Sequence, residues 1–130
     1  MIHTTTADRR VVPAALWTGQ VLLALTFVAA AWPKLSGDPT MVDMFGRIGA
    51  GQWLRYAVGA LELAGAIGLL VPRLCGLAAL GLTALMAGAT VTNMAVLHES
   101  PAIPLACLLV AALVAWGRRA RVAAIVRRYA

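Results

Sequence analysis

The feature that most constrains this chain is the length of its uncharged stretches. Residues 11–33, 74–97 and 100–117 contain no Asp, Glu, Lys or Arg, and residues 56–72 contain only Glu62. A helix that crosses a bilayer needs about 20 predominantly apolar residues. Because hydrophobic residues make up 62% of the chain and charged residues 12%, a water-soluble domain would lack the polar surface that it needs. The sequence therefore predicts an integral membrane protein.

Four membrane-spanning helices are predicted, and they divide the chain into three parts. The predicted spans are residues 12–34, 52–71, 74–96 and 102–117. They form a body over residues 12–117, which follows a short tail (1–11) and precedes a basic tail (118–130). Because the connections between spans are short, we expect an all-α fold, an antiparallel four-helix bundle.

The positions of Lys and Arg predict the orientation of the bundle. The basic residues concentrate in the two tails and in the turn that contains Arg73. Since cytoplasmic segments carry an excess of Lys and Arg, we expect both termini on the cytoplasmic side of a bacterial-type plasma membrane. An Arg cluster directly after a span typically sets the orientation of that span in the membrane and attracts anionic lipid. We therefore predict contact with the bilayer and no binding of nucleic acid.

The connection between the first two spans, residues 36–50, has the signals of a short helix. Asp38 is suited to the N-cap and Pro39 to the first helical position. Apolar residues then recur at helical spacing, namely Met41, Met44, Phe45 and Ile48. We expect either an interfacial helix over the outer mouth of the bundle or an ordinary loop whose apolar residues dip into lipid.

Glu62 is the most informative residue for function, because it lies near the middle of a span. A carboxylate there costs on the order of 2.5–3.5 kcal/mol, so it must face the bundle, gain a partner or take up a proton. It is the candidate catalytic residue, as a general acid or base, and a candidate ligand-binding residue. The structural alternative is a hydrogen bond to Thr90 or Asn93 that joins two helices.

Other polar residues are expected near Glu62 in the outer half of the bundle. The predicted ligand-binding set is Lys34, Arg55, Glu62, Thr90, Asn93 and His98. Polar groups that converge in an apolar wall suit a small amphipathic ligand. Arg55 is about 10 Å from Glu62 along one helix, too far for direct pairing, and for Lys34 we slightly favour snorkelling to the interface. No metal site is predicted, since His98 has no second ligand.

Three motifs resemble those of a known family. Trp32-Pro33-Lys34-Leu35 closes the first span. The second span contains Gly59-Ala60-Leu61-Glu62-Leu63-Ala64-Gly65 and leads to Leu69-Leu70-Val71-Pro72-Arg73. Over residues 18–115 the chain resembles the DoxX/DoxD-like family of small four-helix membrane proteins. The resemblance implies a bundle in the cytoplasmic membrane, with Lys34 and Glu62 at the family's recurrent positions.

The resemblance also implies classes of function. Some members of the family are membrane subunits of a thiosulfate:quinone oxidoreductase, others belong to thiol-redox complexes, and related animal proteins resemble assembly chaperones. We expect this chain to bind a quinone or another amphipathic small molecule near Glu62 within a membrane redox system, with no covalently bound cofactor and with a redox partner subunit. The alternatives are a cofactor-free membrane enzyme, of isomerase, cyclase or epoxide-opening type, and an assembly or scaffold subunit. A homo-oligomer is left open.

Overall fold

The computed structural model describes residues 6–129, with side chains from Val11 onward, and each regular element in that range is a helix. The helices are α1 (Thr6–Ser36), α2 (Pro39–Ile48), α3 (Trp53–Leu70), α4 (Cys75–Ala95), α5 (Ala102–Gly117) and α6 (Arg119–Tyr129). The predicted all-α class is confirmed. Residues 1–5 of the predicted N-terminal tail and residue 130 of the basic tail lie outside the described residues.

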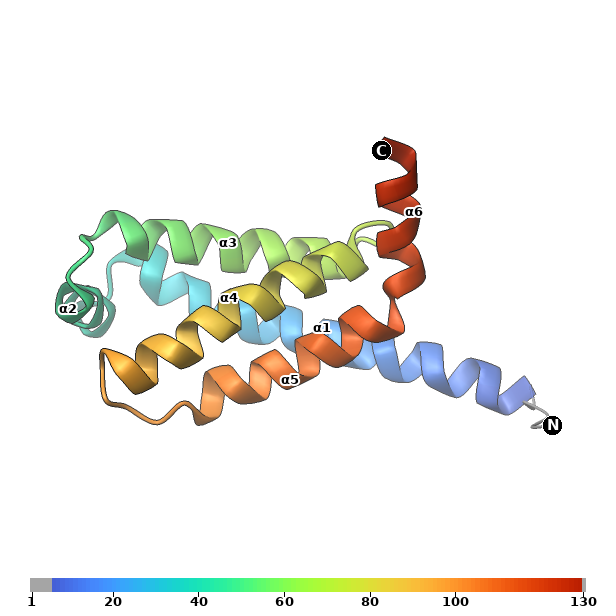
Figure 1. The fold of residues 1–130 in the computed structure, drawn as a ribbon, viewed down its shortest axis with the longest axis horizontal. Helices are drawn as coiled ribbons and strands as arrows, with labels where there is room; N and C mark the ends of the chain where they lie inside the picture. Colours follow the sequence, from blue (N-terminus) through green and yellow to red (C-terminus); the bar gives the residue numbers. More distant parts are fainter. Residues whose placement is uncertain (1–5, 130) are drawn as a thin grey trace.

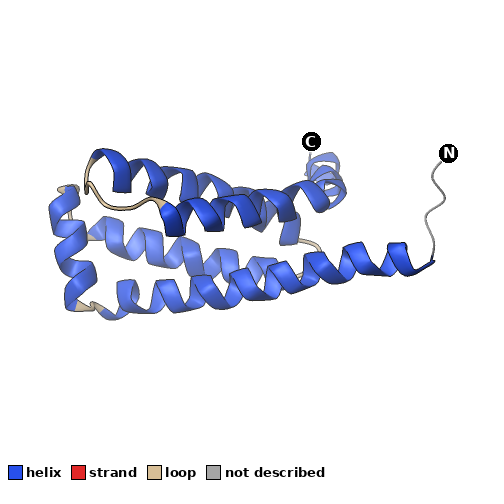
Figure 2. Ribbon diagram, turned by 90° about the horizontal axis from the view of Figure 1, so that it is seen from below, coloured by secondary structure: helices blue, strands red, loops and turns tan. Residues whose placement is uncertain are grey.

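Four long helices lie side by side and run alternately between the two ends of the molecule (Figure 1). Helix α1 packs against α3 and α5, and α4 packs against α3 and α5. Helix α2 crosses one end of the group (Figure 2). At the other end the chain bends by 65° between α5 and α6. These four helices coincide with the apolar segments of the sequence, while the basic tail is itself a helix.

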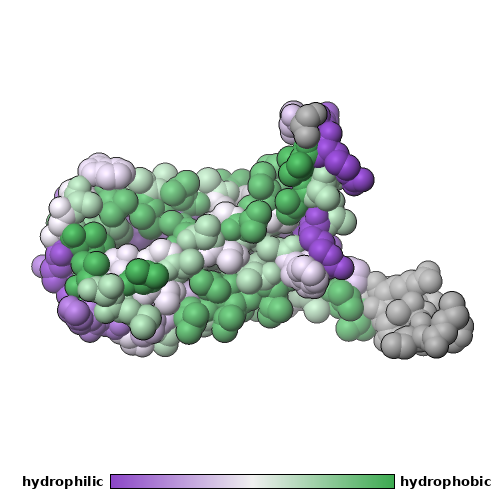
Figure 3. All heavy atoms as spheres, in the orientation of Figure 1, coloured by the Kyte–Doolittle hydropathy of each residue, from purple (hydrophilic) through white to green (hydrophobic). Residues whose placement is uncertain are grey.

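The outward faces of the long helices are apolar. Leu61, Val91 and Leu113 keep 57%, 63% and 68% of their surfaces exposed. Hydrophobic residues cover the middle of the face seen in Figure 3, and hydrophilic residues gather at its two ends. Helix α1 from Val11 onward, α3 and α4 are each long and apolar enough to cross a membrane, and the bent α5–α6 pair makes a fourth candidate if it is one span. Such a surface matches lipid rather than water.

The predicted helix in residues 36–50 is confirmed as α2. The Asp38 carboxylate accepts a hydrogen bond from the backbone N–H of Thr40 at 2.9 Å, and Pro39 occupies the start of the helix. The helix ends at Ile48 and is capped by Gly49, whose φ of 84° lies in the left-handed region that favours glycine. Phe45 is buried, so α2 is anchored on the end of the bundle.

The interior of the bundle is filled by small and medium apolar side chains. The central cluster is Leu23, Ala24, Phe27, Ala66, Leu69, Ala79, Leu82, Met86, Ala111 and Val114. Helices approach closely where a residue has no side chain. At Gly68 of α3, an added Cβ would lie 2.8 Å from the Cβ of Ala78 on α4. Because lipid competes equally well for apolar side chains, close packing of this kind holds membrane helices together.

Replacing Gly68 by Ala should destabilise the protein. The new methyl group meets the rigid Ala78 side chain, and overpacking of this kind costs about 1–3 kcal/mol. Thermal unfolding in detergent measures the change. The matched control is Gly88→Ala on α4, where a Cβ has no neighbour within 4 Å and helix propensity favours Ala by up to about 1 kcal/mol. Equal unfolding temperatures for the two variants would contradict this account of the α3–α4 contact.

Candidate functional site

The centre of the candidate site is an ion pair between α1 and α3. The ammonium nitrogen of Lys34 lies 2.9 Å from Glu62 Oε1, and the two side chains are 13% and 3% exposed. The expectation that Lys34 snorkels to the interface is therefore wrong. Its position three residues after the buried Ala31 places its side chain on the inner face of α1, because residues three and four apart share one face of a helix.

A glycine on α3 makes the close approach of Lys34 possible. Gly59 lies one turn before Glu62 on the same face of the helix. An added Cβ there would lie 3.0 Å from Leu35 Cδ2 and 3.1 Å from Lys34 Cβ. The absence of a side chain at this position lets the end of α1 approach the backbone of α3. The spacing Gly-x-x-Glu therefore has a physical reason: the glycine admits the lysine that pairs with the carboxylate.

Arg55 contacts the backbone of Lys34 rather than the charged groups of the ion pair. Its Nη1 donates a hydrogen bond to the backbone carbonyl of Lys34, its Nε donates to Gln52 Oε1 at 2.9 Å, and the residue is 5% exposed. The last carbonyls of a helix lack partners within the helix, and a cation is favourable near them. Arg55 therefore holds the end of α1 in place, while the contact with the Glu62 carboxylate is made by Lys34.

The ammonium group of Lys34 has hydrogen-bonding capacity that its protein partners do not use. Its nitrogen donates to the Ala30 carbonyl oxygen at 3.1 Å and contacts Glu62 Oε1. A lysine ammonium carries three donors. The third N–H is free to donate to an oxygen atom of another molecule.

The other three predicted site residues have separate positions. Thr90 donates to the Met86 carbonyl one turn earlier on α4, at 2.8 Å. Asn93 Nδ2 donates to the Ser100 carbonyl at 3.0 Å, so it stabilises the loop between α4 and α5. His98 is exposed in that loop with φ at 52°. The structure thus groups Lys34, Arg55 and Glu62, and a binding role for the other three stays a prediction.

A second ion pair lies at the same end of the molecule as α2. Arg47 Nη2 of α2 donates to Glu99 Oε1 in the α4–α5 loop at 2.9 Å, and Asp43 Oδ2 lies 3.6 Å from Arg47 Nε. The hydrogen bond to Glu99 raises the pKa of Arg47 above its usual value. These groups are about half exposed or more, so we assign them the attachment of α2 and no chemistry.

A buried polar cluster at the opposite end was not predicted. Gln20 is fully buried, its Nε2 donates to the Leu69 carbonyl at 2.8 Å, and its Oε1 accepts from Arg118 Nε at 2.8 Å. Arg118 is 8% exposed and lies over the Trp17 ring. Gln20 could have been found from its helical spacing to Leu23 and Ala24 on the buried face of α1. Nothing in the sequence marks Arg118 among the other arginines of its tail.

The described part of the chain offers few groups for thiol or metal chemistry. Cys75 and Cys107 are both free thiols. Within residues 11–129, whose side chains the structure describes, no cluster of three or more His, Cys, Asp or Glu side chains is placed to hold a metal ion.

Comparison with models of known families assigns the chain to one of them. A family model described as the DoxX-like family matches residues 18–116. The chain belongs to the DoxX-like family. The match includes Lys34, Arg55 and Glu62 and stops before α6. No curated protein and no solved structure shows significant similarity to the chain. The family match and the apolar helices together show that this DoxX-like chain is a multi-pass membrane protein.

Removing only one charge of the Lys34–Glu62 pair should destabilise the fold more than removing both charges. Lys34→Met leaves a buried carboxylate without its partner, which costs about 3–5 kcal/mol. The double variant Lys34→Met with Glu62→Leu replaces the pair by apolar side chains and should recover most of that loss. Thermal unfolding of both variants in the same detergent gives the comparison. A double variant as unstable as Lys34→Met would argue against the pair as observed.

Proposed function

We propose that this DoxX-like protein binds a quinone, or an amphipathic molecule with a similar carbonyl head, at the Lys34–Glu62 pair. The protein would act as the membrane component of a redox system. The observation that carries the proposal is the ion pair itself, with its 2.9 Å contact and a carboxylate that is 3% exposed. An ionisable residue inside a membrane segment is by default a functional candidate, because its burial is expensive.

The chemistry of the pair suits a quinone head group. The unused N–H of Lys34 donates to a carbonyl oxygen, and a carboxylate one contact away accepts a proton from a quinol hydroxyl or returns one. Lys34 is the more accessible member of the pair, at 13% exposed, so the ligand approaches from its side. Electrons come from or go to a redox partner subunit, and the proton transfer at Glu62 accompanies them.

The placement of the protein in the membrane is also part of this proposal. Four spans, with α5 as the fourth, put both termini and the basic residues of α6 on the cytoplasmic side of a bacterial-type plasma membrane. The Lys34–Glu62 pair then lies in the outer half of the bilayer, beneath α2. A quinone dissolved in the lipid reaches this depth without crossing water.

Glu62→Gln should weaken binding of the reduced form, the quinol, by roughly tenfold to a hundredfold, because it removes the charged acceptor of the quinol hydroxyl. The probe is a labelled short-chain benzoquinol, titrated against the protein in nanodiscs under reducing conditions. Asp43→Asn is the matched control, because it removes an exposed carboxylate from α2 at the same end and should leave the affinity unchanged. Unaltered affinity in a folded Glu62→Gln protein would disprove the proposal.

A scaffold role is the second candidate, and the near-complete burial of Glu62 favours it. In this alternative the pair only clamps α1 to α3, and the protein assembles with another membrane protein. The Lys34→Met, Glu62→Leu double variant separates the two candidates. A clamp made of apolar side chains preserves co-purification of a partner, whereas ligand binding at the charged pair is lost. The enzyme alternative, with Glu62 as general acid or base, requires turnover of a lipophilic substrate by the purified protein.

A further inference from the structure

A cavity lies at the end of the molecule opposite α2, where the chain bends from α5 into α6. Its volume is about 570 Å³, within the range of about 300–1,000 Å³ that is usual for ligand sites. Ten residues of three helices line it: Leu80, Thr83, Ala112, Ala115, Trp116, Arg119, Val122, Ala123, Val126 and Arg127. Apart from one threonine and two arginines, the lining is apolar, and Glu62 does not belong to it.

The bend between α5 and α6 creates this cavity. Helix α5 has 16 residues and is therefore about 24 Å long, which is short for a hydrocarbon core of about 30 Å. The 65° turn carries α6 away from α5, so the side chains of Leu80, Trp116 and Val126 are left at least half exposed. With α5 as the fourth span, as proposed above, this apolar hollow lies at the cytoplasmic edge of the bilayer, where a lipid acyl chain is the molecule available to fill it.

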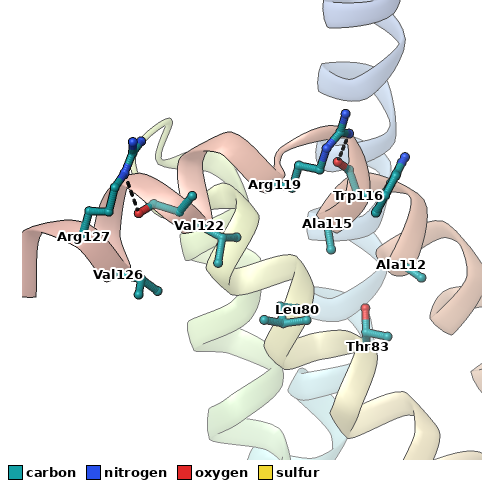
Figure 4. A pocket seen from close by; sticks show the side chains of 10 residues that line it. Leu80, Thr83, Ala112, Ala115, Trp116, Arg119, Val122, Val126 and Arg127 are labelled. Atoms are coloured by element: carbon teal, nitrogen blue, oxygen red, sulfur yellow. Dashed lines mark hydrogen bonds between the residues drawn. The ribbon is translucent and has the colours of Figure 1, made fainter. Parts of the chain in front are cut away.

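Two arginines give the cavity a charged rim. In Figure 4 the guanidinium groups of Arg119 and Arg127 lie on the same side of the cavity, and Leu80 and Thr83 lie on the opposite side. Arg119 Nη1 donates to the Trp116 carbonyl at 2.8 Å and Arg127 Nε to the Ala123 carbonyl at 3.4 Å. Each of these bonds uses one N–H of a group that carries five, so donors remain for an anion.

Among residues 11–129, no acidic side chain forms an ion pair with these arginines. The sequence contains no Asp or Glu after Glu99, and among residues with described side chains the ion pairs lie elsewhere. Guanidinium groups bind phosphate with two parallel hydrogen bonds. Basic pockets between membrane helices are suited to anionic lipid head groups. The charge of the rim therefore matches a phosphate, and the interior matches a hydrocarbon chain.

We infer that the α4–α5–α6 cavity is a binding site for an anionic phospholipid. One acyl chain fills the space between Leu80, Ala115 and Val126, and the phosphate is bound by Arg119 and Arg127. The site is separate from the Lys34–Glu62 pair and uses α6, which lies outside the range matched by the family model. Bound lipid fixes the angle of α6 by replacing the packing that the bend removes.

The test counts lipids that remain on the protein. The purified chain is incubated with an equal mixture of phosphatidylglycerol and phosphatidylcholine that carry the same acyl chains, and native mass spectrometry measures which lipid is retained. The wild-type protein should retain one phosphatidylglycerol in preference to phosphatidylcholine, by roughly thirtyfold for two arginines near the membrane surface. The Arg119→Gln, Arg127→Gln double variant should lose this preference. Equal retention of the two lipids by the wild type would overturn the inference.

Two further variants make the result specific to this cavity. Arg128→Gln removes a charge from the same helix at a residue outside the lining, and it should leave the preference intact. If it reduces the preference as much as the paired variant, the attraction is a diffuse charge effect and the proposed site is wrong. Ala115→Phe fills the cavity and should lower retention of both lipids. Unchanged retention in a folded Ala115→Phe protein would also overturn the inference.

Discussion

The structure depends on one charged contact inside a body that is otherwise apolar. Lys34 and Glu62 join α1 to α3 at 2.9 Å, with the carboxylate 3% exposed. Inside the bundle neither charge is solvated by water, so the attraction between the two offsets the cost of burying them. Two neighbours make the contact possible: Gly59 admits the end of α1, and Arg55 binds the Lys34 carbonyl. The candidate site is therefore a small set of residues built around a helix end.

Helix α1 is held by polar contacts at two depths. Gln20 ties it to α3 and Arg118 near one end of the bundle, and Lys34 ties it to Glu62 near the other. These residues are about 21 Å apart along the helix, and the buried Leu23, Ala24, Phe27 and Ala31 lie between them. Hydrogen bonds between helices add to the close packing that holds membrane helices together. Two polar contacts on one face fix both the rotation and the depth of α1.

One member of the buried ion pair was marked clearly by the sequence, and the error about its partner has a physical reason. Glu62 was identified because a carboxylate in an apolar segment is rare and costly. The role of Lys34 was misjudged, because a lysine near the end of a span can snorkel or turn inward with the same local sequence. Thr90 and Asn93 donate hydrogen bonds to carbonyls of α4 and of the following loop, and their role in ligand binding stays a prediction. A polar side chain that satisfies its own helix is indistinguishable, in sequence, from one that awaits a ligand.

The sequence by itself determined the apolar segments, the all-helical class, the start of α2 at Asp38 and Pro39, and the presence of an ionisable group in the membrane. Each of these follows from residues that are close together along the chain, because hydrophobic runs and helix caps are local. Only the tertiary structure decided the partner of Glu62, the pairing of Gln20 with Arg118, and the bend that opens the cavity beneath α6. Those depend on how helices distant in sequence rotate and approach one another, and no local pattern specifies that geometry.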